Sequence, residues 1–256
     1  MRHAVPEPLT ATVTAPLTAP LTARVELVDI ADIPGGGALH LMRRGSDFSI
    51  CYGDDELMGS QVRHSEQALA TLTCERLGDN RGRWLIGGLG MGFTLGSALA
   101  VLGPAAQVVV AELVPKVVAW ANGPLAHIIG GSLADPRVSL EVADVHDVIV
   151  RAPASFDAIL LDVDNGPDGL IQLANDRLYC NWGLRAAHAA LRPGGVLAVW
   201  SSYTDADFRE RLHRAGFAVE EITIRAEDYA GDVRHTIWLA SKPANPAKPA
   251  NPAKLG

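Results

Sequence analysis

The sequence has few cysteines, few aromatic residues and no excess of positive charge. Its three cysteines, Cys51, Cys74 and Cys180, are far apart and match neither a zinc-site spacing nor a disulfide framework. The net charge is -7 and no stretch is rich in lysine or arginine, which argues against binding to a nucleic-acid backbone. These absences predict a reducing compartment and a small-molecule or protein partner.

Long hydrophobic runs are also missing. No uncharged apolar stretch reaches the roughly 18 residues of a membrane span, and prolines and threonines interrupt any signal-peptide core near the start. We therefore expect a cytoplasmic protein without membrane contact. With 256 residues, 48% of them hydrophobic, the chain is long enough for one well-buried domain and a small appendage.

Both ends of the chain are rich in proline. Residues 8–23 repeat Pro, Thr and Ala, and residues 242–256 repeat Asn-Pro-Ala-Lys units. Because proline removes hydrogen-bond donors and blocks helix formation, we expect disordered tails over 1–23 and 243–256.

The body of the chain divides into two parts. Residues 24–63 contain short strand-like runs separated by Gly and Asp, which predicts a small N-terminal antiparallel β-meander. Residues 64–77 then predict a helix with Ser65 as a candidate cap, at the start of a main domain over 64–242.

Apolar runs alternate with helical patterns through the main domain. Strands are expected over 83–88, 107–113, 138–144, 156–163 and 195–202, and a terminal hairpin over 218–224 and 234–241. A helix is expected over 184–195, among others. The pattern predicts an α/β fold: a Rossmann-like, doubly wound, mostly parallel seven-stranded sheet with an antiparallel last strand.

Four glycines crowd the segment GGLGMG (87–92), directly after the first strand of the main domain. The spacing of Gly88, Gly90 and Gly92 is G-x-G-x-G. A dinucleotide fingerprint would need its third glycine at Phe93 or Leu95, and no Lys-Ser or Lys-Thr follows to make a phosphate-binding loop. G-x-G-x-G after a first strand is typical of S-adenosylmethionine-dependent transferases.

Acidic residues close the next two strands. Glu112 could accept hydrogen bonds from both hydroxyls of a ribose, and Asp144 could accept a hydrogen bond from an adenine amino group. The alternative is that both residues only cap the helices that come after them. Two such acids beside a glycine turn favour the binding of a nucleoside.

The loop DVDNGPDG (162–169) follows the fourth strand and is rich in aspartate. Clustered carboxylates there could hold an amine and accept its proton. Turn chemistry explains Asn165, Gly166 and Pro167, but it does not explain Asp162 directly after an apolar strand.

The order and spacing of these motifs over residues 38–242 resemble the spermidine synthase-like proteins of the class I S-adenosylmethionine-dependent methyltransferase fold. The resemblance implies that Gly88, Gly90 and Gly92 face the nucleoside. It implies that Glu112 binds the ribose and Asp144 the adenine. Asp162 stands where the family places the first aspartate of its catalytic Asp-x-x-Asp, which helps to deprotonate the attacking amine.

The sequence also departs from that family. The last position of Asp-x-x-Asp is Asn165, with Asp164 beside it, so we expect Asp164 and Asn165 to shape the acceptor pocket. The acceptor-binding segment is shortened; Gln61 and Glu66 match it, and Tyr203 could line the pocket. A polyamine needs carboxylates along its length, and this sequence has few of them.

The expected function is therefore a transferase that uses S-adenosylmethionine or its decarboxylated form, without a metal. It would move an alkyl group, with methyl favoured, to a small-molecule amine or hydroxyl. One alternative is a polyamine aminopropyltransferase, and another is a non-catalytic nucleoside-binding relative. The family resemblance also implies a homodimer built through the N-terminal sheet.

Overall fold

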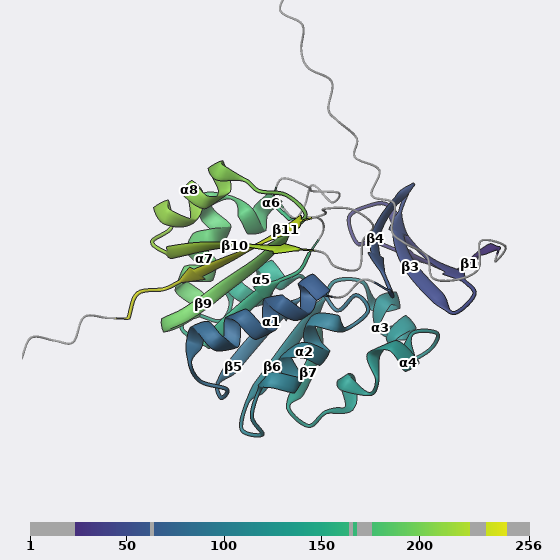
Figure 1. Cartoon of the computed structure of the whole chain (residues 1–256), viewed down its shortest axis with the longest axis horizontal. Coiled ribbons are helices and arrows are strands. Elements are labelled where there is room, and N and C mark those ends of the chain that lie inside the picture. Colours follow the sequence, from purple (N-terminus) through teal and green to yellow (C-terminus); the bar gives the residue numbers. More distant parts are fainter. Residues whose placement is uncertain (1–23, 62–63, 164–165, 168–175, 226–233, 245–256) are drawn as a thin grey trace, which may run out of the picture.

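A computed structural model describes residues 24–61, 64–163, 166–167, 176–225 and 234–244. The predicted tail 1–23 lies outside the described residues, and so does the tail 243–256 apart from its first two residues. Figure 1 shows a small sheet next to a larger layered domain, with the small sheet near the carboxyl ends of the central strands.

The small sheet is a four-stranded antiparallel meander in the order β1-β2-β3-β4, which confirms the prediction. Its strands are β1 (Val25–Asp32), β2 (Ala38–Arg44), β3 (Asp47–Tyr52) and β4 (Asp55–Gly59). Leu41 pairs with Ile50 across the sheet, and both are buried in the same core cluster as Phe48. Because side chains alternate along a strand, one face of this sheet packs on the large domain.

The large sheet has seven strands in the order β10-β11-β9-β8-β5-β6-β7. The central strands pair in parallel, and β11 is antiparallel to both of its neighbours, as expected. The strands are β5 (Arg83–Gly87), β6 (Gln107–Glu112), β7 (Val138–Val142), β8 (Phe156–Leu161), β9 (Leu191–Ser201), β10 (Ala218–Arg225) and β11 (Arg234–Ser241).

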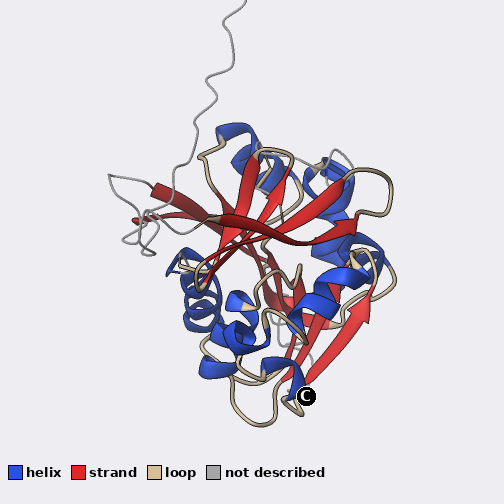
Figure 2. Cartoon of the chain, turned by 90° about the vertical axis from the view of Figure 1, so that its right-hand side faces the viewer, coloured by secondary structure: helices blue, strands red, loops and turns tan. Residues whose placement is uncertain are grey.

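Helices cover both faces of this sheet (Figures 1 and 2). One face buries Trp84 and Ile86 of β5 beneath α1 (His64–Leu77), α2 (Phe93–Val101), α3 (Pro115–Ala121) and α4 (Ala126–Ile129). The other face buries Leu85 of β5 beneath α5 (Val145–Val150), α6 (Asp176–Tyr179), α7 (Asn181–Ala190) and α8 (Ala206–Arg214). A short 3₁₀ helix spans Ser132–Ala134. The alternation of buried side chains along each strand thus gives two cores, as a doubly wound sheet requires.

Two details differ from the expectations. Helix α1 begins at His64, so Ser65 lies inside its first turn and its hydroxyl donates to Glu66 Oε2 at 2.8 Å instead of capping the helix. Helix α7 ends at Ala190, and residues 191–195 of the predicted helix belong to β9, where Leu191 pairs with Phe156. Pro193 cannot donate a helical hydrogen bond, and Gly194 has a φ of 83°.

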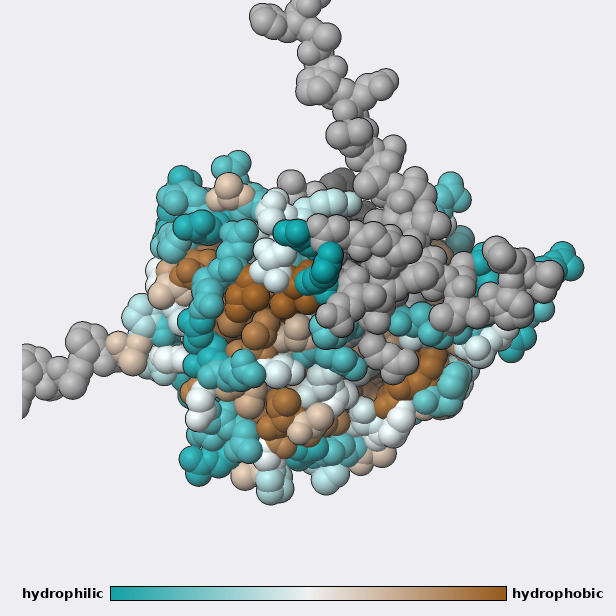
Figure 3. Space-filling model, in the orientation of Figure 1, coloured by the Kyte–Doolittle hydropathy of each residue, from teal (hydrophilic) through white to brown (hydrophobic). Residues whose placement is uncertain are grey.

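The surface in Figure 3 shows hydrophobic patches interrupted by hydrophilic residues on that face of the molecule. No helix in the described part of the chain has the length and apolar character needed to cross a membrane.

Candidate active site

Strand register brings the predicted residues together at the carboxyl edge of the sheet. Gly87, the last residue of β5, pairs with Ala111 of β6 on one side and with Leu161 of β8 on the other. The next positions along these strands are Gly88, Glu112 and Asp162. Because neighbouring strands lie about 4.8 Å apart, these three positions form one row across the sheet edge.

The glycine turn has a backbone that few other residues could adopt. Gly88, Gly90 and Gly92 have φ values of 86°, 48° and 77°, all in the left-handed region. A Cβ atom at Gly88 would lie 3.0 Å from the backbone oxygen of Asp162. The turn therefore needs glycine both for its φ angles and for the close approach of the loop after β8.

Glu112 holds the glycine turn in shape from the neighbouring strand. Its side chain is only 6% exposed, and its two oxygens accept hydrogen bonds from the amides of Leu89 and Val114, each at 2.8 Å. Burial raises the pKa of this carboxyl, while the backbone hydrogen bonds lower it. Each carboxylate oxygen has a second lone pair, so these bonds are compatible with the expected binding of ribose hydroxyls.

Asp162 lies half-buried just beyond β8, opposite the start of α2. Its Oδ2 accepts a hydrogen bond from the Thr94 hydroxyl at 2.7 Å. Burial raises the pKa of Asp162, and the hydrogen bond from Thr94 lowers it. A carboxylate with a raised pKa at a sheet edge is suited to accept a proton, as a general base must.

Asp144 lies beyond β7 and makes two kinds of contact. Its Oδ1 accepts from the His146 amide at 2.8 Å and thereby caps α5, which is the alternative considered from the sequence. Its Oδ2 forms an ion pair with Arg177, which also contacts Asp147. The predicted adenine contact would have to share the Asp144 carboxylate with the His146 amide and this arginine.

Among the described residues, Asp144, His146 and Asp147 form a group with ligand atoms within 4.8 Å of one another. The Arg177 guanidinium already places a positive charge on both carboxylates. We therefore assign no metal to this group.

The predicted acceptor residues Gln61, Glu66 and Tyr203 each make a different kind of contact or have a different exposure. Gln61 donates to Asp47 Oδ1 at 2.5 Å, and Glu66 is buried in the first turn of α1. Tyr203 is 44% exposed beyond β9, and its amide donates to Ser201 Oγ at 3.1 Å. Asp164 and Asn165 lie outside the described residues, so their predicted roles stay predictions.

Three residues of this region were not foreseen from the sequence: Met58, Thr94 and Arg177. Met58 of β4 contacts the glycine turn, where its sulfur accepts a hydrogen bond from the Met91 amide at 3.2 Å. Thr94 was recognisable only as a polar residue in the first turn of an apolar helix. No sequence signal pointed to Met58 or Arg177, because each is 33 residues away from its partner.

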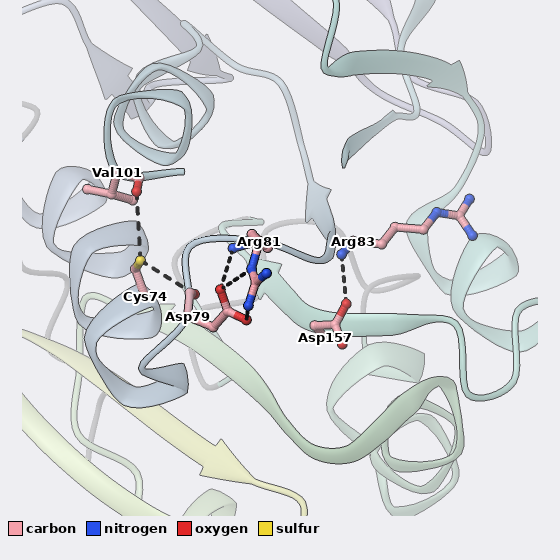
Figure 4. A network of polar contacts seen from close by, with 6 residues as sticks. All are labelled: Cys74, Asp79, Arg81, Arg83, Val101 and Asp157. Carbon is pink, nitrogen blue, oxygen red and sulfur yellow. Dashed lines mark hydrogen bonds and ion pairs between the residues drawn. The ribbon is translucent and has the colours of Figure 1, made fainter. Parts of the chain in front are cut away.

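A separate polar network lies at the opposite ends of the central strands, their amino ends (Figure 4). Asp157 Oδ2 accepts from the Arg83 amide at 2.7 Å, and Asp79 accepts from Arg81. A shallow hollow of about 220 Å³ lies beside Asp79 and Asp157. This hollow is at the amino ends of β5 and β8, so it is remote from the glycine turn.

No family model matches this chain. In sequence, it is 35% identical to the polyamine aminopropyltransferase of Mycobacterium tuberculosis over 96 residues, which cover 36% of this chain and 18% of that protein. It is 36% identical to polyamine aminopropyltransferase 2 of Pseudomonas aeruginosa over 73 residues, or 27% of this chain and 19% of that protein. The matched segment thus spans less than a fifth of either relative.

Solved structures share the fold over most of the chain. Spermidine synthase from Thermotoga maritima superposes with a TM-score of 0.68 at 17% identity, covering 88% of this chain and 76% of that one. A spermidine synthase in complex with the transition-state analogue AdoDATO gives 0.66 at 16% identity, covering 86% and 74%.

A methyltransferase is also among the structural neighbours. The 1,6-didemethyltoxoflavin-N1-methyltransferase of Burkholderia thailandensis, solved with 1,6-didemethyltoxoflavin and S-adenosylhomocysteine, gives a TM-score of 0.51 at 19% identity. The alignment covers 71% of this chain and 79% of that one. These likenesses confirm the expected fold.

Proposed function

We propose that this chain, which has the spermidine synthase-like form of the class I methyltransferase fold, is an alkyl transferase. Its donor would be S-adenosylmethionine or the decarboxylated form, and its acceptor a small-molecule amine or hydroxyl. The observation that carries the proposal is the row of Glu112, the glycine turn and Asp162 on adjacent strand ends.

The strand order supports a direction for the donor. Asp144 follows β7, Glu112 ends β6, the glycine turn follows β5 and Asp162 follows β8, and these strands are neighbours in that order. An adenine over Asp144 and a ribose over Glu112 would bring the sulfonium tail across the glycine turn. The reacting carbon would then lie close to Asp162.

The chemistry asks little of the protein beyond alignment and removal of one proton. The acceptor nitrogen or oxygen forms a bond to the carbon next to the sulfonium, and the carbon–sulfur bond breaks to release a neutral thioether. The acceptor proton passes to the carboxylate of Asp162. The raised pKa of Asp162 makes that carboxylate a stronger base than an exposed aspartate.

Methyl transfer is favoured over aminopropyl transfer because the acceptor segment provides few carboxylates for a polyamine. Aminopropyl transfer to a polyamine is the second candidate, supported by the sequence similarity to polyamine aminopropyltransferases. A non-catalytic nucleoside-binding role is the third, and it would need donor binding without any product.

The test is calorimetric titration of the full chain with S-adenosylmethionine, decarboxylated S-adenosylmethionine and methylthioadenosine. Product analysis with a panel of small amines then separates the candidates. Methyl transfer releases S-adenosylhomocysteine, whereas aminopropyl transfer releases methylthioadenosine.

A pair of matched variants links binding to the site. Glu112→Gln removes the charge beside the glycine turn and is expected to weaken binding of all three ligands. Glu141→Gln makes the same change on β7 at a residue that pairs with Arg151, and it should leave binding unchanged. Failure of the wild-type chain to bind any of the three ligands would refute the proposal.

A further inference from the structure

Met58 is a residue of the small sheet that contacts the glycine turn. Its side chain projects from β4, opposite Ile50 of β3, on the face that packs against the large domain. Its sulfur lies 3.2 Å from the Met91 amide nitrogen. A Cβ atom at Gly90 would lie 2.9 Å from the same sulfur, so the thioether fills the space that this glycine leaves.

The Met91 amide is held differently from its neighbours in the turn. The Gly88 amide donates to the backbone oxygen of Ala111 at 2.9 Å, and the Gly92 amide donates to that of Leu89 at 2.8 Å. The Leu89 amide donates to the Glu112 carboxylate at 2.8 Å.

All of those acceptors are oxygens, whereas the acceptor for Met91 is a thioether sulfur. A thioether is a weak acceptor. An oxygen of a bound ligand would therefore replace it more readily than it would replace any other acceptor in the turn.

Methionine is also suited to move. Its side chain is unbranched and has three rotatable bonds, so the sulfur can swing away from the turn while β4 stays in place. The backbone contacts that hold β4 to β3 are independent of this rotation.

We propose that Met58 determines donor specificity. In the free protein its thioether accepts the hydrogen bond of the Met91 amide, and on donor binding the carboxylate of S-adenosylmethionine replaces the thioether as the acceptor. This inference rests on the proposed function, in which the donor tail crosses the glycine turn between Glu112 and Asp162. A decarboxylated donor has no oxygen in its tail that could replace the Met58 sulfur as acceptor. Its ammonium would meet a thioether and an amide hydrogen, neither of which carries a negative charge.

Two substitutions test this role. Met58→Leu keeps the side-chain volume but removes the sulfur acceptor, so the Met91 amide loses no hydrogen bond to the protein when the donor carboxylate binds. Binding of S-adenosylmethionine should tighten by about twofold to tenfold, the range expected for one neutral hydrogen bond. Binding of methylthioadenosine, which has neither carboxylate nor ammonium, should stay the same.

Met58→Glu places a carboxylate at the same amide. It should weaken the binding of S-adenosylmethionine by about tenfold or more and tighten that of the decarboxylated donor, because its charge repels one tail and attracts the other. The matched control is Met42→Leu on β2. Met42 pairs with Ser49, the residue before Ile50, so it lies on the opposite face of the small sheet and should change no affinity.

Calorimetry with the three ligands on the wild-type chain and these variants decides the matter, with the melting temperature of each variant as a check on folding. The inference would be overturned if Met58→Leu changed the affinities for S-adenosylmethionine and methylthioadenosine by the same factor, or left the affinity for S-adenosylmethionine unchanged. Either result could be obtained with a wild-type chain that binds its donor. If Met58→Glu does not fold, the Met58→Leu comparison is sufficient. A wild-type chain that binds none of the ligands would instead remove the proposed function, and this inference with it.

Discussion

Replacing Gly88 with alanine gives the sharpest test of how the glycine turn is built. The φ of Gly88 is 86°, and its new Cβ would lie 3.0 Å from the Asp162 backbone oxygen. A left-handed φ costs an L-residue roughly 1–2 kcal/mol. Overpacking against an atom that cannot move freely adds about 1–3 kcal/mol.

Alanine also has fewer conformations than glycine in the unfolded chain, which offsets about 0.4–1 kcal/mol of that cost. The expected net loss in the free energy of unfolding for Gly88→Ala is therefore roughly 1–4.5 kcal/mol. It would be measured by urea denaturation at neutral pH.

Gly130→Ala is the matched control. Gly130 follows α4 with a φ of 63°, but nothing lies within 4 Å of the position of its Cβ. Gly130→Ala has only the backbone cost, so its loss in the free energy of unfolding should be roughly 0–1.5 kcal/mol. If Gly88→Ala were no more destabilising than Gly130→Ala, the close approach of the loop after β8 would not be what demands glycine at this position.

Three further changes test other parts of the molecule. Asp162→Asn should abolish turnover and raise the free energy of unfolding at pH 7, because burial raises the folded-state pKa of Asp162 and the wild-type chain therefore loses stability as pH rises above the ordinary aspartate pKa. The free energies of unfolding of the two proteins should converge in acid. A constant difference across a pH series of urea titrations would count against this. The wild-type chain should lose stability as pH falls below about 6.5, because burial lowers the pKa of His235 and the unfolded chain takes up the proton first. His235→Gln should remove this loss of stability. An unchanged pH dependence of the free energy of unfolding would contradict this. Ile30 is an apolar residue that is 46% exposed on the edge strand β1, and Ile30→Glu replaces it with a charged one. This change should convert the homodimer expected through the small sheet into monomers in sedimentation velocity. A monomeric wild-type chain would refute that expectation.

Much of the fold could be predicted because its signals are local. Short apolar runs marked the parallel strands, and the glycines and acids at their ends marked the carboxyl edge of the sheet. The errors were local as well. Ser65 had the right residue type for a cap but lay one position inside α1, and the proline at 193 ended the predicted helix early.

The sequence by itself determined the order of the elements, the glycine turn and the acids expected to bind a nucleoside. All of these depend on residue type and on spacing along the chain. Only the tertiary structure decided what contacts them: Thr94 reaches Asp162 across 68 residues, and Met58 reaches Met91 across 33. The physical reason is that these contacts arise where one sheet edge meets the first turn of α2 and a strand of a separate sheet. No periodicity in the sequence records how packed elements face each other.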